Sequence, residues 1–359
     1  MMQDSGLSPG ALSVGAEKSV GATSRALVLG GGTAGLLAAL VLARHVSHVT
    51  VVDPQEGEPR AVGPRLLGVR DQQLLDTLVP GLCQALRDAG AVPLNLGQHI
   101  EWFLLDRWRP HYQSTLEVLC CSAPLLDAAL HHRLQSERHV SFRAVQAVEG
   151  LLWDERERRI AGVRARLGPQ RATEYPAELV VDATGSMSKS PDWLGGLGYA
   201  RPAETVFPAG LNRATRLYHW PQEACESWRA LVIQPTRGAQ PRGAVALTLE
   251  EERLHVTMVG TPDNWSPSDT EWLDFAATLP SPRLAACLRD ARPMAPAAVS
   301  PGRYHYRQHY ERLAPAPDGL LAFGGTACCP PALQDDTLAL DVLSAVVLER
   351  CLDTPGPMG

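Results

Sequence analysis

The sequence lacks several patterns that mark common classes of enzyme. Its eight cysteines form no C-x-x-C pair, so neither a zinc ribbon nor a disulfide framework is indicated. It contains no G-x-S-x-G nucleophile elbow and no H-E-x-x-H motif. His131 and His132 are adjacent and would point in different directions on a helix, so they make a poor metal pair. We therefore expect no metal site.

Positive charge and long apolar runs are also scarce. The net charge is −6 and only two residues are lysine, Lys18 and Lys189, so nucleic acid is not an expected partner. No apolar run approaches the length of a membrane span. Residues 1–24 are rich in Ser, Gly and Ala without a basic start and apolar core, which predicts a disordered tail and no signal peptide. We expect a cytoplasmic protein whose partner is a small molecule, with no membrane contact.

A dinucleotide-binding unit is present at residues 26–53, which read ALVLGGGTAGLLAALVLARHVSHVTVVD. The segment gives an apolar strand, a G-x-G-x-x-G turn, a helix of small residues and a second strand ending in an acid. Gly30 permits the tight turn, Gly32 lets the backbone approach a pyrophosphate, and Gly35 allows the helix to pack closely on the strand. The helix start offers N–H donors to phosphates. Asp53 follows Gly35 by 18 residues, where an acid can hold ribose hydroxyls.

With 359 residues, the chain is long enough for two structural units around a substantial core. A helix is expected over 72–89 and another from Leu125 to about Arg133, followed by strands at 140–148, 151–153 and 160–167. ELVVDATG at 178–185 and DGLLAFGG at 318–325 predict strands that return to the first sheet, and 337–351 a closing helix. Alternating strands at 210–220, 230–234, 243–249 and 254–260, with helices at 270–279 and 282–290, predict an inserted sheet.

We predict an α/β fold in which a Rossmann-type FAD/NAD(P)-binding domain carries an inserted, mostly antiparallel substrate domain. The nucleotide-binding domain is expected to consist of residues 25–100, 120–198 and 315–359. The substrate domain is expected to consist of residues 101–119 and 199–314.

The order of these segments resembles the single-component flavin monooxygenases of the para-hydroxybenzoate hydroxylase type. Within that group it looks most like actinobacterial FAD-dependent epoxidases and cyclases of polyketide pathways. The matching stretches are VVDPQEGEPR, SAPLLDAALHHRL, DATGSMSKSPDWLGGLGY and HYERLAPAPDGLLAFGG, so the resemblance covers nearly the whole chain. It implies an FAD site whose ADP half is held by Gly30, Gly32, Gly35 and Asp53.

Several flavin contacts implied by the resemblance are missing. The family's V-P-Q-G-R-H-x-H loop is replaced by VGPRLLGV from Val62, and its Ser-Arg-Pro by a segment with Ala123 in the Arg position. The Gly-Asp pair whose Asp binds ribityl hydroxyls has Gly325 in the Asp position. The Pro-x-x-Gly-Gln-Gly segment at the isoalloxazine is replaced by PPALQDDT, which brings in Asp335 and Asp336.

These changes weaken the case for a redox flavin. Each charge-assisted hydrogen bond to a ribityl hydroxyl is typically worth about 1.5–3 kcal/mol, and Gly325 cannot supply one. Asp335 and Asp336 would repel a flavin N1–C2=O region that becomes anionic on reduction. We therefore expect that no cofactor is required, with FAD at most a weak or structural ligand of the residual ADP half-site.

Three functions stay open at this stage. The first is a non-redox cyclase, for example a [4+2] cycloaddition on a polyketide-type intermediate, since the resemblance includes Diels-Alder cyclases whose flavin is not a redox participant. The second is an FAD- and NAD(P)H-dependent epoxidase or hydroxylase in polyketide or polyether biosynthesis. The third is a non-catalytic protein of the pathway that binds the substrate or another enzyme.

Two aromatic clusters supply the candidate catalytic residues for ring closure. One contains Tyr218, His219 and Trp220, in which Tyr218 and Trp220 would share one face of a strand and His219 the other. The second contains Tyr304 and Tyr306 with neighbouring histidines. Tyr and His can donate hydrogen bonds to a carbonyl, and Trp can form an apolar wall. All of them could equally be core or edge residues.

Overall fold

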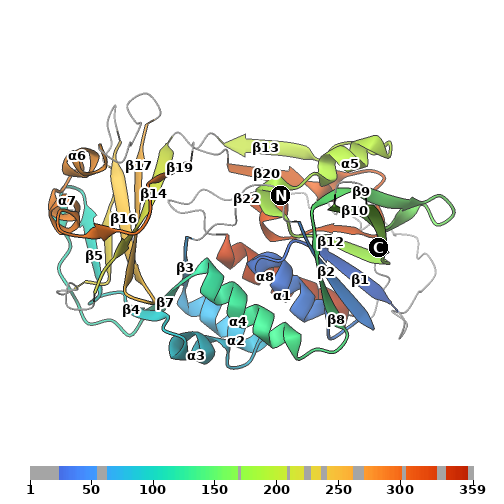
Figure 1. The fold of residues 1–359 in the computed structure, drawn as a ribbon, viewed down its shortest axis with the longest axis horizontal. Helices are drawn as coiled ribbons and strands as arrows, with labels where there is room; N and C mark the ends of the chain where they lie inside the picture. The colour runs from blue at the N-terminus through green and yellow to red at the C-terminus, as the bar shows by residue number, and fades with distance from the viewer. Residues whose placement is uncertain are drawn as a thin grey trace, which may run out of the picture.

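A five-stranded parallel sheet forms the centre of the larger part of the molecule (Figure 1). The computed structural model describes residues 24–54, 63–168, 171–207, 211–221, 228–235, 241–261, 271–300, 305–329 and 337–354. The strand order is β21 (Leu320–Ala322), β12 (Leu179–Asp182), β1 (Arg25–Leu29), β2 (His48–Pro54) and β8 (Val140–Val145). The strands are rich in Val and Leu because both faces of the sheet are covered.

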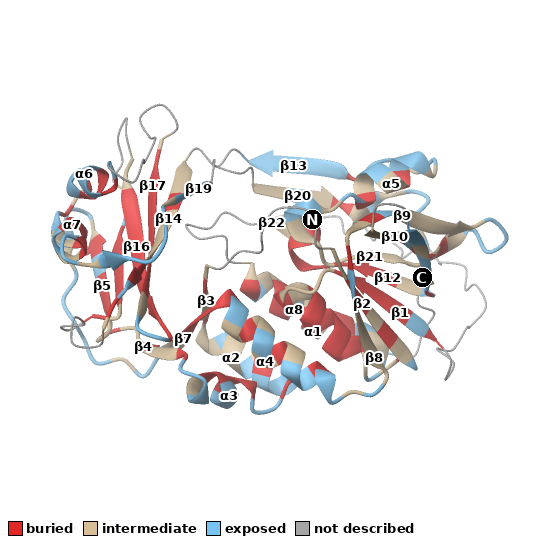
Figure 2. Ribbon diagram, viewed as in Figure 1, coloured by how far each residue is buried: buried red, intermediate tan, exposed pale blue. Residues whose placement is uncertain are grey.

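Helices and a second sheet cover the two faces of this parallel sheet. Val28 and Val51 pack under α1 (Thr33–Leu42), α4 (Ala123–Gln135) and α8 (Leu338–Asp353). Leu27 and Leu29 face the other way, toward the antiparallel sheet of β9 (Ala147–Asp154), β10 (Arg159–Gly168) and β11 (Arg171–Pro176). Figure 2 shows α1 almost wholly buried, as expected for a helix that is apolar on all sides.

An eight-stranded sheet forms the second part of the molecule, at the left in Figure 1. Its strands run in the order β18 (Arg292–Pro293), β14 (Asn212–His219), β17 (Arg253–Gly260), β16 (Gly243–Leu249), β15 (Ala230–Ile233), β5 (Ile100–Leu104) and β6 (Arg107–Trp108), with β19 (Ala298–Ser300) beside β14. All neighbours are antiparallel except β15 and β5.

The two faces of the eight-stranded sheet have different environments. The face that packs on α6 (Trp272–Ala277) and α7 (Arg283–Leu288) is here called the outer face, and it carries Leu231 and Val256. The opposite, inner face carries Val232 and Leu247 and packs partly against β4 and β7. Alternation along the strands therefore separates two apolar layers.

Two three-stranded sheets and three short helices complete the described fold. One sheet, of β3 (Pro64–Leu67), β7 (Glu117–Ser122) and β4 (Val92–Asn95), lies between the two larger parts. The other consists of β13 (Ala203–Phe207), β20 (His305–His309) and β22 (Cys328–Cys329). The helices are α2 (Val69–Leu78), α3 (Leu82–Asp88) and α5 (Ser190–Gly196).

Most of the predicted elements are confirmed. The βαβ unit is β1, α1 and β2, both return strands join the parallel sheet as β12 and β21, and the inserted strands form a mostly antiparallel sheet. The fold class predicted from the sequence is therefore correct. No helix in the described part of the chain is long and apolar enough to cross a bilayer.

Some element predictions are wrong. The helix expected over 72–89 is two helices, α2 and α3, because Gly81 takes a left-handed conformation with φ +81° after Pro80. The helix expected from Leu125 starts at Ala123, and strand β11 was not predicted. The predicted tail, 1–24, and the PPALQDDT segment up to Asp336 lie outside the described residues, except Ser24.

Candidate functional site

The glycine turn after β1 has the geometry of a dinucleotide cradle. Gly30 has φ +98°, and a Cβ there would lie 2.9 Å from the carbonyl oxygen of Ala183. A Cβ on Gly35 would lie 1.9 Å from the carbonyl oxygen of Gly30, so only glycine lets α1 approach the turn this closely. Gly32 is different, because a Cβ there would meet no atom within 4 Å. The backbone at Gly32 is thus open to a ligand.

The start of α1 can serve as an anion site. Gly32 is its N-cap, no side chain caps it, and no acidic residue lies in its first turn. The first N–H groups of a helix have no partner within the helix and attract negative charge. At the end of β2, the Oδ1 of Asp53 accepts a hydrogen bond of 3.0 Å from the Gly31 N–H. This bond fixes the carboxylate beside the turn, where the motif places a ribose-binding acid.

A buried carboxylate organises the loop after β12. Asp182 is fully buried and accepts hydrogen bonds from the Thr184 N–H at 3.0 Å and from its hydroxyl at 2.6 Å. The hydroxyls of Ser188 and Ser190 also donate to it. Four donors compensate the burial of this charge. Sequence reasoning missed this network, although D-A-T-G-S-M-S-K-S places four hydroxyl residues within eight positions of the acid.

The loop after β21 meets α8 through another buried acid. The Gly325 N–H donates to Oδ1 of Asp341 at 3.3 Å, and the Thr337 hydroxyl donates to Oδ2 at 3.0 Å. The Tyr306 hydroxyl donates to the Gly325 carbonyl at 2.8 Å. A Cβ on Gly325 would have its nearest contact at 3.6 Å, an ordinary van der Waals distance. Position 325 is buried and has room for a Cβ, but it carries none.

The start of α4 is closed to a large side chain. Ala123 is buried, and its N–H donates to the Gly63 carbonyl at 3.0 Å. The adjacent Ser122 caps the helix by accepting the Leu125 N–H at 3.3 Å, and its own N–H donates to the buried Glu250 at 3.0 Å. An arginine at position 123 would have to displace this packing.

The inner face of the eight-stranded sheet presents an apolar wall with two polar groups. Four residues lie side by side on the adjacent strands β5, β15, β16 and β17. They are, in that order, Trp102, Val232, Val245 and Thr257. Trp102 keeps 39% of its surface exposed. His255 lies two residues before Thr257 on β17, so the two side chains share a face. Its neighbours on the adjacent strands are Leu217 and Leu247.

His255 is held in its neutral form by its surroundings. Burial lowers the pKa of His255 from 6.5 to about 4, and its Nδ1 lies 3.5 Å from the Thr257 hydroxyl. A neutral imidazole carries one N–H donor and one acceptor. Sequence reasoning did not single out this residue, because nothing local distinguishes it from other histidines in strands.

The predicted aromatic candidates are dispersed. Tyr218 is buried in the outer-face core, where the guanidinium of Arg216 lies 5.7 Å from its ring. His219 and Trp220 line a pocket on the outer face. Tyr306 lies on β20 and its hydroxyl reaches the loop after β21, and burial and the nearby thiols of Cys329 and Cys328 raise its pKa. Tyr304 lies outside the described residues.

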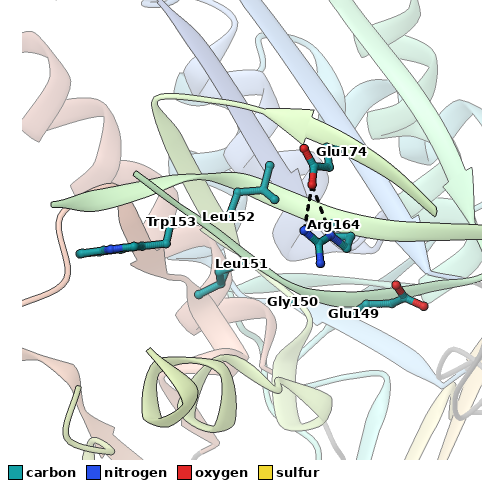
Figure 3. Close-up of a pocket in the computed structure, with 7 residues that line it drawn as sticks. All are labelled: Glu149, Gly150, Leu151, Leu152, Trp153, Arg164 and Glu174. Atoms are coloured by element: carbon teal, nitrogen blue, oxygen red, sulfur yellow. Dashed lines mark hydrogen bonds and ion pairs between the residues drawn. The ribbon is translucent and has the colours of Figure 1, made fainter. Parts of the chain in front are cut away.

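One surface pocket can be set aside. A hollow of about 420 Å³ lies at the sheet of β9, β10 and β11. Figure 3 shows the residues that line it. Arg164 and Glu174 face each other there across paired strands and form an ion pair of 2.9 Å. Both side chains are more than half exposed, so the pair is screened by water. Because these charges neutralise each other, we assign no ligand to this pocket.

Comparison with known structures identifies the fold. The flavin-dependent brominase Bmp2 aligns with a TM-score of 0.71 and 12% identity over 93% of this chain and 81% of that chain. PqsL, a probable FAD-dependent monooxygenase from Pseudomonas aeruginosa, aligns with a TM-score of 0.68 and 18% identity over 92% and 86%. The chain has the fold of the flavin-dependent monooxygenases. At these identities the likeness concerns the fold alone.

Among curated proteins, Protein Rv3254 of Mycobacterium tuberculosis is 29% identical over 353 residues, which is 91% of this chain and 72% of that protein. No protein-family model matches the chain. The structural alignments with Bmp2 and PqsL show that the flavin-monooxygenase-like fold extends over nearly the whole sequence.

The residues present fit one end of FAD better than the other. The cradle at Gly30 and Gly35, the open backbone at Gly32 and the fixed Asp53 carboxylate suit the ADP half. At the ribityl end, Gly325 offers no side-chain acceptor, and its N–H already donates to Asp341. The described residues therefore match the ADP half of the cofactor and leave the ribityl chain without a carboxylate at position 325.

Proposed function

We propose that this chain is a cyclase that closes a ring in a polyketide-type intermediate without net redox change, by a [4+2] cycloaddition or a related reaction. The observation that carries the proposal is Gly325, where the carboxylate expected from the resemblance to bind the ribityl chain is absent, although a Cβ there would make only ordinary contacts. The substrate would be a flexible small molecule.

The inner face offers what such a reaction needs. In a [4+2] closure two C–C σ bonds form from the π electrons of a diene and an alkene, no group leaves, and the product has the mass of the substrate. Holding the substrate in a folded, near-attack conformation can lower the activation barrier by up to roughly 7–11 kcal/mol. We propose that the substrate folds against the exposed part of Trp102, beside the buried Val232 and Val245.

Polar groups on the same face can polarise the substrate. The Thr257 hydroxyl and the neutral imidazole of His255 lie side by side in an apolar surround. A hydrogen bond from either group to a carbonyl conjugated with the alkene would lower the barrier, and more so in a site that excludes water. Neither group has to change its charge during the reaction.

The first test is the mass balance of the reaction. Purified protein is incubated with a linear candidate precursor, and the product is analysed by mass spectrometry with and without NAD(P)H. We expect a product of unchanged mass, formed without NAD(P)H. A product heavier by one oxygen atom, with NAD(P)H consumed, would refute the proposal, and stoichiometric binding without turnover would indicate a binding protein.

The second test restores the missing contact. Gly325→Asp places a carboxylate where the Cβ has room, and we expect FAD to bind about tenfold tighter or better, since a charge-assisted hydrogen bond is worth about 1.5–3 kcal/mol. Gly196→Asp is the matched control, because Gly196 is exposed on α5 and its Cβ would meet no atom within 4 Å. Unchanged affinity in Gly325→Asp would contradict our interpretation of position 325.

A second candidate function is favoured by the intact ADP half-site. An FAD- and NAD(P)H-dependent epoxidase or hydroxylase would need Gly30, Gly32, Gly35 and Asp53 as they are. When bound, flavin would supply oxygen activation. Absorbance between about 350 and 500 nm and chromatography of the heat-released supernatant distinguish the two functions. Stoichiometric FAD that NAD(P)H bleaches would favour the monooxygenase, and colourless active protein would favour the cyclase.

A further inference from the structure

A pocket of about 700 Å³ lies on the outer face, remote from the glycine turn and from the inner face. It lies between the residues that follow β14 and the helix α7. Its walls include His219, Trp220, Trp228, Arg283, Cys287 and Arg292. The volume falls within the roughly 300–1,000 Å³ typical of small-molecule sites. We call it the outer pocket.

Two tryptophans give the outer pocket a rigid apolar side. The ring centroids of Trp220 and Trp228 are 5.7 Å apart, with 38° between the ring planes, and both residues are buried. Opposite them, α7 and the turn after it contribute Ala286 and Ala291, whose small side chains leave space beside the rings. Such a surface favours a flat or conjugated body over a branched one.

Arg283 is held in a fixed position in the same wall. Its Nη2 forms an ion pair of 2.7 Å with Glu101, whose side chain is only 6% exposed, and its guanidinium lies 5.2 Å from the Trp108 ring. Only one of the guanidinium nitrogens is used in that pair. The others remain as donors in the planar arrangement that suits a carboxylate.

A second cation lies at the mouth of the pocket. Arg292 is exposed and lines the pocket with His219. Asp290 is the one acid among the lining residues, and because it is exposed, as Arg292 is, solvent screens both charges. The pocket therefore combines an aromatic side with cationic donors at its edge.

We propose that the outer pocket binds an organic carboxylate with a flat or conjugated apolar body. The body lies against Trp220 and Trp228, and the carboxylate accepts hydrogen bonds from Arg283 and Arg292. This binding does not depend on the ring closure proposed for the inner face.

The probe for this proposal is cis-parinaric acid, a conjugated polyene carboxylate whose fluorescence rises in an apolar site, and its methyl ester is the uncharged comparison. We expect one molecule of the acid to bind per chain, and the ester to bind more weakly. Equal affinity for acid and ester would overturn the carboxylate part of the proposal. Failure of the acid to saturate at one per chain would overturn it entirely.

Two variants locate the site. Ala286→Trp fills the pocket from an exposed position on α7, and we expect it to weaken binding of both probes by tenfold or more. Ala277→Trp is its control, since Ala277 is exposed on α6 and is not among the pocket residues. Unchanged binding in Ala286→Trp would refute the site.

Arg292→Gln tests whether the positive charge of Arg292 binds the carboxylate, and it leaves the buried residues unchanged. We expect it to weaken binding of the acid by about tenfold or more and to leave binding of the ester unchanged, since one charge-assisted hydrogen bond is lost. An equal loss for both probes, or no loss for the acid, would contradict the assignment of the carboxylate to this edge. Arg283 is left intact because its removal would strand the buried Glu101 charge. Because Arg292 is exposed, this variant keeps the test valid even if Ala286→Trp fails to fold.

Discussion

His255 should make the folded protein sensitive to acid. In the folded chain burial lowers its pKa from 6.5 to about 4, so the unfolded chain binds this proton at a higher pH than the folded chain does. The contribution of His255 to stability is therefore complete above pH 6.5 and is lost as the pH falls from 6.5 toward 4. A difference of 2.5 in pKa, at about 1.36 kcal/mol per unit, corresponds to about 3 kcal/mol.

The assay is urea unfolding at a series of pH values between about 4 and 8, for the wild type and for His255→Gln. The variant removes the titrating group and keeps a polar side chain beside Thr257. Acidic residues titrate in both proteins, so the difference between the two stability curves isolates His255. We expect the wild type to lose about 3 kcal/mol more than the variant across this range.

The control for this experiment is His219→Gln, which removes an imidazole that is exposed to solvent. We expect its stability at pH 8 to lie within about 0.5 kcal/mol of the wild type, as is usual for a change at an exposed position. If the curves of the wild type and His255→Gln run parallel below pH 6.5, His255 accepts its proton without unfolding. In that case water would reach His255 on the inner face, and its imidazole would not act as a neutral donor at acidic pH.

Three further predictions concern the glycine turn and the Asp182 network. Gly35→Ala should cost about 3 kcal/mol or more in urea unfolding, since its Cβ would lie 1.9 Å from a carbonyl oxygen; stability within about 0.5 kcal/mol of wild type would contradict the close packing. Gly32→Val should leave stability nearly unchanged but abolish binding of ADP measured by calorimetry, and retained binding would show that the nucleotide does not contact this turn. Asp182→Ala should cost about 3–5 kcal/mol, because it leaves several buried donors unpaired, whereas Ser190→Ala should cost about 1–2 kcal/mol; equal losses in these two variants would refute the network.

The parts of the site that could be predicted are those encoded within a short stretch of chain. Gly30, Gly35 and Asp53 belong to one βαβ unit, and the spacing of that unit fixes where each residue lies. The helix break after α2 was also encoded locally, in Pro80 and Gly81, and was missed only because the apolar spacing continues through it.

The remaining features depend on contacts between distant segments. Asp341 reaches Gly325 across 16 positions, because α8 packs beside the loop after β21. The outer pocket likewise needs α7 to pack near the end of β14, which brings Trp228 and Arg283 to one surface. No local pattern in the sequence predicts such pairs, since they arise only when the sheets and helices are assembled.

The three glycines of the turn do not carry equal information about ligands. Gly30 and Gly35 are required by the chain itself, because a Cβ on either would collide with its own backbone oxygens. They would persist in a protein that had lost its nucleotide altogether. Gly32 has an extended backbone with φ −87° and open space around it, so the fold places no such demand on it. Two physical reasons are left for glycine at position 32, its place as the N-cap of α1 and the close approach of a ligand. Of the three glycines, this residue is therefore the one that bears on a bound nucleotide, whereas Gly30 and Gly35 report on packing.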